Sequence, residues 1–313
     1  MNDCPNGSAE NEFYIAIFSL SPQTQVELFS GILIIYLMAL LGNLKISFLV
    51  FMVPKLHTPM YFFLCNLSIL DVISTTTTIP KLLAITLTKD HRISYRFCMT
   101  QLFFYMLCTD GEFFILTSMA YDRYVAVCKP LQYYMIMRKN VYIIMASSAW
   151  IVGTLNSLLN TLLTCVLQFC YSHDINNFFC DLNSVVVLSS SDITSRKVFM
   201  VIEVFIIALL QFLPMIISYV YIFSAIKKIC SSSGRMKAFS SCTSHLITVI
   251  LFYGPLMFLY LKPESENSKE QDMLLSMLYL VVDPMLNPLV YSLRNKEVMG
   301  AISSVARRRK AKL

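Results

Sequence analysis

The chain has 313 residues, of which 56% are hydrophobic and only 14% are charged, with a formal net charge of +6 and a mean hydropathy of +0.62. In a soluble domain, roughly a quarter of all residues are charged, so this composition excludes a soluble globular protein. The apolar content also excludes disorder, and ten cysteines are too few for a disulfide scaffold. The composition therefore predicts an integral membrane protein.

Seven apolar stretches are long enough to cross a bilayer, whose hydrocarbon core of about 30 Å takes roughly 20 residues of helix. They are continuous runs rather than the short alternating segments of a β-barrel. The predicted fold class is an all-α membrane protein, a seven-transmembrane helix bundle that forms one domain over residues 28–292. The predicted spans are 28–53, 59–87, 97–125, 141–163, 198–226, 238–261 and 273–292.

The segments outside the spans predict the orientation. Residues 1–27 lack the basic and apolar regions of a cleaved signal peptide, so the first span must direct insertion. One side of the membrane would carry sixteen Lys and Arg residues and the other eight, which places the N-terminus outside and the C-terminus in the cytoplasm. We expect glycosylation of Asn6, which lies in an external Asn-Gly-Ser sequon.

Residues 293–313 end in a strongly basic segment. In a soluble protein such a segment could bind nucleic acid. Beside seven spans, attraction to the anionic lipid of the inner leaflet is the better explanation. We expect a short amphipathic helix and a basic cytoplasmic tail there, in contact with membrane lipid and not with nucleic acid.

Two acidic residues fall at similar depth inside the predicted bundle. Asp71 lies twelve residues past Pro59, about 18 Å into span two, and Glu112 lies eleven residues before Arg123, about 16 Å from the same side. Two buried carboxylates cannot cheaply both ionise, so a pair would share a proton or hold a cation such as Na⁺. The alternative is that each is neutral and hydrogen-bonded elsewhere. We expect no other metal and no cofactor.

Two short motifs lie where a conformational switch could operate. Asp122, Arg123 and Tyr124 stand where span three meets the cytoplasm, so the Asp and Arg can form an ion pair that opens when a partner competes for the Arg. In span seven, Asn287 precedes Pro288, which lacks an N–H and leaves a backbone carbonyl without a donor. Asn287 or a water could supply that donor, and the proline could mark a hinge or a static kink.

Four longer motifs occur in chain order: PMYFFL at 59–64 with Asp71, MAYDRYVAVC at 119–128, KAFSSCTSHL at 237–246 and PMLNPLVYSLRN at 284–295. Together with the seven spans, they resemble the signatures of the olfactory (odorant) receptors, a group of rhodopsin-like (class A) G-protein-coupled receptors. The motifs are spread over nearly the whole chain. They are specific to the family and not to any ligand.

The resemblance implies an odorant receptor of the plasma membrane, without catalytic activity. A small volatile odorant would bind among the outer halves of spans three, five, six and seven, where the candidate residues are Tyr105, Met106, Thr109, Asp110, Glu203, Ile207 and Tyr253. Binding would open the cytoplasmic side for a heterotrimeric G protein of the stimulatory, olfactory type and raise cyclic AMP. The residues implied in this step are Asp122, Arg123, Tyr124, Tyr219, Asn287, Pro288 and Tyr291.

Three other functions are compatible with a polytopic chain. A non-olfactory chemosensory G-protein-coupled receptor would share the same motifs. An ion-coupled transporter could use intramembrane acids, but the chain shows no internal repeat and no pair of broken helices. An intramembrane enzyme is disfavoured because no HExxH, GxSxG or Gly-rich phosphate loop occurs.

The resemblance also implies a disulfide between Cys98, at the outer end of span three, and Cys180, which lies in the loop between spans four and five. A second loop disulfide is usual in this family, and Cys170 matches its first half, but Ser190 stands where the partner cysteine would be. We therefore expect Cys170 to be a free thiol. Pairing with Cys4 or with Cys165 is the alternative.

The charge of the odorant depends on Asp110 and Glu203. Asp110 lies twelve residues past Cys98, about 18 Å below the outer end of span three, and Glu203 lies six residues past Lys197, about 9 Å into span five. No basic residue is expected at matching depth. Either both acids are protonated and bonded to Thr, Ser or backbone groups, or one ionises to bind a cationic odorant such as an amine.

Overall fold

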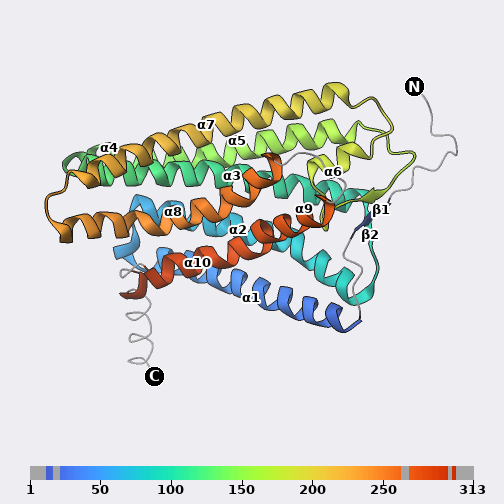
Figure 1. Cartoon of the computed structure of the whole chain (residues 1–313), viewed down its shortest axis with the longest axis horizontal. Helices are drawn as coiled ribbons and strands as arrows, with labels where there is room; N and C mark the ends of the chain where they lie inside the picture. Colours follow the sequence, from blue (N-terminus) through green and yellow to red (C-terminus); the bar gives the residue numbers. More distant parts are fainter. Residues whose placement is uncertain (1–11, 17–21, 262–267, 295–297, 301–313) are drawn as a thin grey trace.

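The structure is a computed structural model that describes residues 12–16, 22–261, 268–294 and 298–300 (Figure 1). Long helices run side by side along the longest axis of the molecule. These are α1 (Pro22–Met52), α2 (Pro59–Thr88), α3 (Tyr95–Cys128), α5 (Lys139–Cys165), α7 (Thr194–Lys227) and α8 (Ser232–Leu261).

The last membrane segment consists of three consecutive pieces. They are α9 (Ser268–Met277), a π-helical turn (Leu278–Val282) and α10 (Asp283–Arg294). The predicted seventh span is therefore helical but not one regular α-helix. The shorter helical elements of the described chain are 3₁₀ turns at Pro54–Leu56 and Pro130–Gln132, α4 (Tyr133–Ile136) and α6 (Leu182–Val187).

The bundle predicted from hydropathy is confirmed. Six helical stretches in the described chain are long and apolar enough to cross a membrane: α1, α2, α3, α5, α7 and residues 273–291. The remaining predicted span, 238–261, lies within α8, where the structure describes only some of the side chains. Helices extend beyond the predicted limits at several ends, because hydropathy reports the apolar stretch and not the helical turns that continue into polar surroundings.

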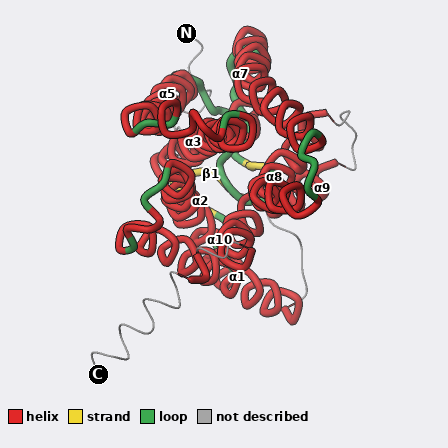
Figure 2. Tube along the Cα trace, turned by 90° about the vertical axis from the view of Figure 1, so that its left-hand side faces the viewer, coloured by secondary structure: helices red, strands yellow, loops and turns green. Residues whose placement is uncertain are grey.

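Helix α3 lies at the centre of the bundle and contacts α2, α5, α7 and α8 (Figure 2). Its residues Ile115, Leu116 and Met119 are fully buried, as expected for a helix surrounded by other helices. By contrast, α7 exposes large apolar side chains such as Val201 and Phe205, which are 69% and 63% exposed. Apolar residues face outward here because the surrounding solvent is lipid. The outer surface of α7 is thus a lipid-facing surface.

A small sheet closes the end of the bundle that carries the disulfide, here called the disulfide end. β1 (Glu12–Ile15) pairs antiparallel with β2 (Arg92–Ser94) and parallel with β3 (Asp174–Ile175). Phe13 and Ile15 point inward and are almost completely buried. Part of the stretch predicted as an N-terminal tail is therefore a strand, which no motif in the sequence indicated.

Three sequence predictions concern residues at the two ends of the chain. Asn6 lies outside the described residues. The predicted amphipathic helix and basic tail, 293–313, also lie outside them except for residues 293, 294 and 298–300, which are helical. Glycosylation, the amphipathic helix and the contact of the tail with lipid stay predictions.

Candidate functional site

Asp110 and Glu203 belong to one hydrogen-bonded polar network that connects α3, α5 and α7. The side-chain amide of Asn156 donates to Asp110 Oδ2 at 2.9 Å, and that of Asn160 donates to Glu203 Oε1 at 2.7 Å. The guanidinium of Arg196 donates in turn to Asn160 Oδ1 at 2.7 Å. Asn160 also reaches Asn156 Oδ1, at 3.4 Å. We call these five residues the α5 polar network.

The network corrects two expectations about the acids. Their side-chain partners are amides of α5, not Thr, Ser or backbone groups. A basic residue is present as well, because Arg196, in the first turn of α7, reaches down to Asn160 on α5. Depths estimated by counting residues along each helix did not predict this contact, since a long arginine side chain spans more than one helical turn. The one sequence signal was the i, i+4 spacing of Asn156 and Asn160, which places both on one face of α5.

Several buried polar atoms of this network lack a hydrogen-bond partner among the described residues. They are Glu203 Oε2 and the Nε and Nη1 atoms of Arg196. Buried polar groups are rarely left unpaired, because each costs roughly 1–3 kcal/mol. An acceptor on Glu203 and donors on Arg196 are thus available to a polar group that enters between the helices.

Aromatic side chains from α3, α8 and the π-helical turn pack in the interior of the bundle. The hydroxyls of Tyr105 on α3 and Tyr279 in the π-helical turn are 2.8 Å apart and form a hydrogen bond. Phe179, from the loop before α6, lies edge-on to Tyr105 with ring centroids 4.8 Å apart. On α8, the Tyr253 ring contacts Phe113, with 5.1 Å between centroids. Tyr105 and Tyr253 thus both belong to the buried core of the bundle, and their contact with an odorant stays a prediction.

The other candidate ligand residues lie on the same helices. Thr109 on α3 is partly buried and uses its hydroxyl to donate to the Tyr105 carbonyl at 3.0 Å. Met106 packs against both hydrophobic clusters of the bundle. Ile207 is half-buried on α7, one turn past Glu203. Their contact with an odorant stays a prediction.

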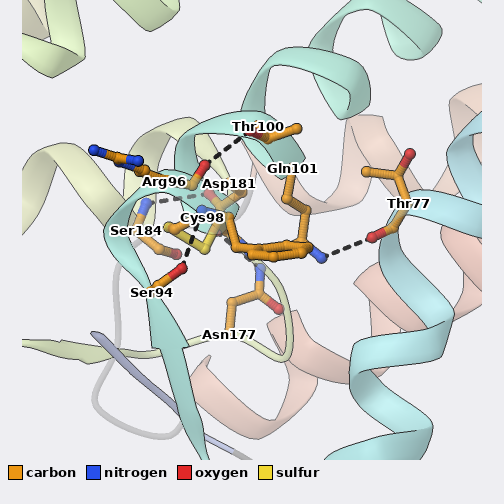
Figure 3. Close-up of a disulfide and its surroundings, with 11 residues drawn as sticks. Thr77, Ser94, Arg96, Cys98, Thr100, Gln101, Asn177, Asp181 and Ser184 are labelled. Carbon is orange, nitrogen blue, oxygen red and sulfur yellow. Dashed lines mark hydrogen bonds between the residues drawn. A yellow bond between two sulfur atoms is a disulfide. The ribbon is translucent and has the colours of Figure 1, made fainter. Parts of the chain in front are cut away.

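The predicted disulfide between Cys98 and Cys180 is present, with Cα atoms 5.5 Å apart (Figure 3). It attaches the loop between α5 and α7 to the start of α3. Gln101, about one turn past Cys98 on α3, accepts a hydrogen bond from the Cys180 backbone N–H at 2.8 Å and donates to the Thr77 carbonyl on α2 at 3.0 Å. The loop is thus fixed to two helices, and Phe178 and Phe179 beside the disulfide are fully buried.

The expectation that Cys170 is a free thiol was wrong, because Cys170 is disulfide-bonded. Ser190, which replaces the usual partner cysteine, instead accepts a hydrogen bond from the Cys170 backbone N–H at 2.8 Å. Cys165, one of the two alternative partners, is free and exposed. Cys4, the other alternative, lies outside the described residues.

A third acid joins Asp71 and Glu112 in the interior. All three carboxyls, including that of Asp283, are buried, and Glu112 lies close enough to interact electrostatically with both Asp71 and Asp283. Asn287 donates to Asp71 Oδ2 at 3.1 Å. Sequence reasoning did not assign Asp283 to this cluster, although an acid in an apolar span was the available signal. Among the described residues, no group of three or more His, Cys, Asp or Glu could hold a metal ion.

The opposite end of α3 carries a buried ion pair, and we call this end of the bundle the Arg123 end. Arg123 donates from Nη2 to Asp122 Oδ2 at 2.5 Å, and Asp122 is fully buried. The hydroxyl of Tyr133 on α4 donates to the other carboxylate oxygen at 2.7 Å. Tyr124 instead faces Tyr221 on α7, with 5.8 Å between ring centroids. Asp122 is thus bonded both to Arg123 on α3 and to Tyr133 on α4.

Tyr219 pairs with a histidine that sequence reasoning left without a role. Its hydroxyl lies 2.6 Å from Nδ1 of His245 on α8, and His245 Nε2 lies 3.1 Å from the Leu116 carbonyl on α3. Since a carbonyl can only accept, Nε2 carries the proton, and Nδ1 of the neutral ring accepts from Tyr219. This contact connects α3, α7 and α8. The position of His245 inside the KAFSSCTSHL motif was the available signal.

In the last segment, the donor for the carbonyl freed by Pro288 comes from α1. The carbonyl that loses its helical partner belongs to Pro284, and the side-chain amide of Asn43 donates to it at 2.8 Å. The sequence analysis expected Asn287 or a water, which was wrong for this bond, since Asn287 donates to Asp71. Tyr291, one turn past Asn287, is buried at the Arg123 end of the same helix.

A bundle of membrane-spanning helices with buried, unpartnered polar atoms at one end and a buried Asp–Arg pair at the other is typical of a receptor of the rhodopsin-like, G-protein-coupled type. The family model described as olfactory receptor matches residues 32–309. Olfactory receptor 1G1 of Gorilla gorilla gorilla is 43% identical over 297 residues, 95% of each chain. Olfactory receptor 13C9 of Homo sapiens is 42% identical over 304 residues, 95% of this chain and 96% of the relative.

A mouse relative shows the same degree of similarity. Olfactory receptor 5AR1 of Mus musculus is 41% identical over 303 residues, 97% of this chain and 98% of the relative. The chain therefore belongs to the olfactory receptor family of G-protein-coupled receptors. It is an odorant receptor and not an enzyme, and its family signals through heterotrimeric G proteins.

Proposed function

We propose that the receptor binds a small volatile odorant between α3, α5, α7 and α8 at the disulfide end, and couples to a stimulatory, olfactory-type G protein at the Arg123 end, which raises cyclic AMP. The disulfide supports placing its end, and the N-terminus, outside the plasma membrane, because disulfides persist in oxidising compartments. The larger number of basic residues at the other end supports a cytoplasmic location.

The unpartnered atoms of the α5 polar network carry the ligand proposal. Glu203 Oε2 lacks a donor and Arg196 lacks two acceptors among the described residues, so an odorant that supplies such groups gains hydrogen bonds that the free receptor does not make. The aromatic side chains of Tyr105, Tyr253 and Phe113, on two of these helices, would contact the apolar part of the odorant.

The network also indicates the chemical class of the odorant. Arg196 shares Asn160 with Glu203 and provides a positive charge near that acid, so Glu203 does not need a cation from the ligand to balance it. A neutral odorant with a hydroxyl can donate to Glu203 and accept from Arg196. We therefore propose that hydroxylated neutral volatiles activate the receptor better than amines do.

Signalling at the Arg123 end requires that the ion pair between Asp122 and Arg123 opens. Asp122 holds Arg123 in the present structure, so this is the closed form of the switch. A G protein that competes for Arg123 binds only the form in which the pair has opened, and odorant binding shifts the equilibrium to that form by its differential affinity. In that form Tyr219 and Tyr291 would stabilise the open arrangement, and Tyr124, Asn287 and Pro288 would adjust with their helices.

Asp71 and Glu112 are proposed to hold a shared proton or a sodium ion. Their burial and the third acid, Asp283, support this, because three adjacent buried carboxyls cannot all ionise without a counter-charge. Replacing external sodium with choline at constant ionic strength would distinguish the two occupants. A sodium site predicts a shift in odorant potency, whereas a shared proton predicts none.

The decisive experiment measures cyclic AMP in transfected cells that are exposed to matched alcohols, amines and apolar volatiles of equal chain length. We expect alcohols to be the most potent class. Glu203→Gln and Asp110→Asn should each lower that potency by about tenfold or more, because a hydrogen bond to a charged group contributes roughly 1.5–3 kcal/mol. Glu27→Gln, which changes an exposed carboxylate on α1, is the matched control and should leave potency unchanged.

Two outcomes would contradict the proposal. If amines are the most potent class and lose their advantage in Glu203→Gln, Glu203 binds a cation instead. If the best odorants are unaffected by both substitutions, the α5 polar network is not the ligand site.

A further inference from the structure

An apolar groove of about 420 Å³ lies between α7 and α8. Its α7 side is formed by residues such as Ile216, Val220 and Phe223, and its α8 side by Leu246, Ile250 and Gly254. The size lies within the usual range of ligand-binding cavities, about 300–1,000 Å³. None of the residues that form the groove takes part in the α5 polar network or in the Asp122–Arg123 pair.

The groove opens toward lipid and not toward the interior of the bundle. Val220 and Ile250, on its two sides, are 58% and 60% exposed. Of the two tyrosines that line it, Tyr219 directs its hydroxyl to His245. The groove thus offers mainly carbon surface to its occupant, so an extended hydrocarbon chain is the chemistry that it accommodates.

Gly254 keeps part of the groove open. Gly254 lies on α8 and lines the groove, and a β-carbon at this position would meet no atom within 4 Å among the described residues, apart from its own helix backbone within four residues and its chain neighbours. Gly31 on α1 has the same property, but it does not line the groove. The two glycines therefore provide a matched pair for substitution, since a β-carbon at either position meets no atom of the described residues.

Basic side chains lie on both helices between the groove and the Arg123 end of the bundle. Measured from the contact between Tyr219 and His245, Lys227 is eight residues farther along α7, about 12 Å toward the Arg123 end. Arg235 is ten residues before His245 on α8, about 15 Å in the same direction. Both side chains are exposed, and no described acidic residue is paired with either. The two cations therefore lie at similar distances from the Tyr219–His245 contact, on the Arg123 side of the apolar groove.

We propose that this groove binds an acyl chain of an anionic phospholipid of the cytoplasmic leaflet, with the lipid headgroup at Lys227 and Arg235. The apolar lining and the lipid-facing opening select the hydrocarbon chain, and the two basic residues select the negative headgroup. The leaflet follows from the orientation proposed above. The binding itself requires neither an odorant nor a G protein.

The test uses the full-length receptor in phosphatidylcholine vesicles that contain a trace of phosphatidylserine with a photoreactive diazirine on one acyl chain. After illumination, mass spectrometry should locate the label mainly in residues 212–223 and 246–254. Gly254→Leu should strongly reduce this labelling because the added side chain occupies the groove, whereas Gly31→Leu should not. Equal labelling of all lipid-facing helices, unchanged in Gly254→Leu, would overturn the proposal.

A second measurement tests the headgroup and does not depend on the folding of the glycine variant. In Lys227→Gln and Arg235→Gln, the preference for the phosphatidylserine probe over a phosphatidylcholine probe should fall by about fivefold for each charge removed. Equal labelling of the wild-type groove by both probes would exclude an anionic lipid. Receptor–receptor crosslinks through 212–223 that disappear in Gly254→Leu would instead identify a second copy of the receptor as the occupant.

Discussion

Asn43 on α1 donates its side-chain amide to the backbone carbonyl of Pro284 in α10, at 2.8 Å. Pro288, four residues later, has no N–H, so this carbonyl would otherwise lack a partner in a lipid environment where water cannot replace it. The same amide also donates to the Ala39 carbonyl at 3.0 Å. One side chain thus compensates for the proline and joins the first and last membrane segments.

Asn43→Ala should therefore destabilise the receptor. It leaves the Pro284 carbonyl unpaired inside the bundle, at a cost of about 1–3 kcal/mol. The measurement is the thermal unfolding midpoint of the purified receptor in detergent. Ser30→Ala removes an exposed hydroxyl that bonds only within α1, and should leave the midpoint unchanged. Equal midpoints for Asn43→Ala and wild type would show that another group satisfies the carbonyl.

A neighbouring glycine makes the same interface possible by its size. A β-carbon on Gly42 would lie 2.8 Å from Cγ of Pro288, closer than atoms can approach. Gly42→Ala should thus push α1 away from α10 and cost about 1–3 kcal/mol of stability, as overpacking does. Gly31→Ala, on the same helix with open space around it, should be neutral or slightly stabilising. Equal effects of both changes on the unfolding midpoint would contradict this steric explanation.

Removal of the Cys98–Cys180 disulfide should reduce the amount of folded receptor at the cell surface. The disulfide closes a sequence separation of 82 residues, and loss of such a bond typically costs 2–5 kcal/mol. Flow cytometry of intact cells that express Cys98→Ser measures this directly. Cys165→Ser, which changes a free and exposed thiol, is the control and should be expressed normally. Full surface expression and odorant response in Cys98→Ser would refute the prediction.

Cys170 should be crosslinked to Cys4 in the mature receptor. Of the ten cysteines in the sequence, six are free in the described chain, two form the Cys98–Cys180 bond, and Cys170 is disulfide-bonded. The tenth cysteine, Cys4, is therefore the partner that we predict for Cys170. Mass spectrometry of a non-reduced, alkylated digest should recover one peptide that contains both residues, and the peptide should separate upon reduction. Recovery of alkylated Cys170 without prior reduction would disprove the pairing.

Weakening the Asp122–Arg123 pair should raise signalling without odorant. In Asp122→Asn, Arg123 loses its charged partner, and a bond of this kind contributes about 1.5–3 kcal/mol, so basal cyclic AMP should increase by about tenfold or more. Tyr133→Phe removes only the hydroxyl donor to Asp122 and should cause a smaller increase. A basal signal that stays at the wild-type level in both variants would show that this pair does not restrain the receptor.

The sequence determined the membrane class and the helix bundle through local composition, and the family through continuous motifs. The Cys98–Cys180 bond was implied by the resemblance to that family. Hydropathy finds spans reliably, since every residue of a span must tolerate lipid. The Asp–Arg pair at 122 and 123 was equally accessible, because its partners are adjacent in the chain.

The tertiary structure alone decided which polar residues meet. Asn156 and Asn160 reach Asp110 and Glu203 across three helices, and Asn43 reaches the Pro284 carbonyl from the other end of the chain. Lipid is as apolar as the interior of the bundle, so periodicity along a helix does not reveal which face is buried. The rotation of each helix is set by packing against its neighbours, and only that packing selects the partner of each buried polar group.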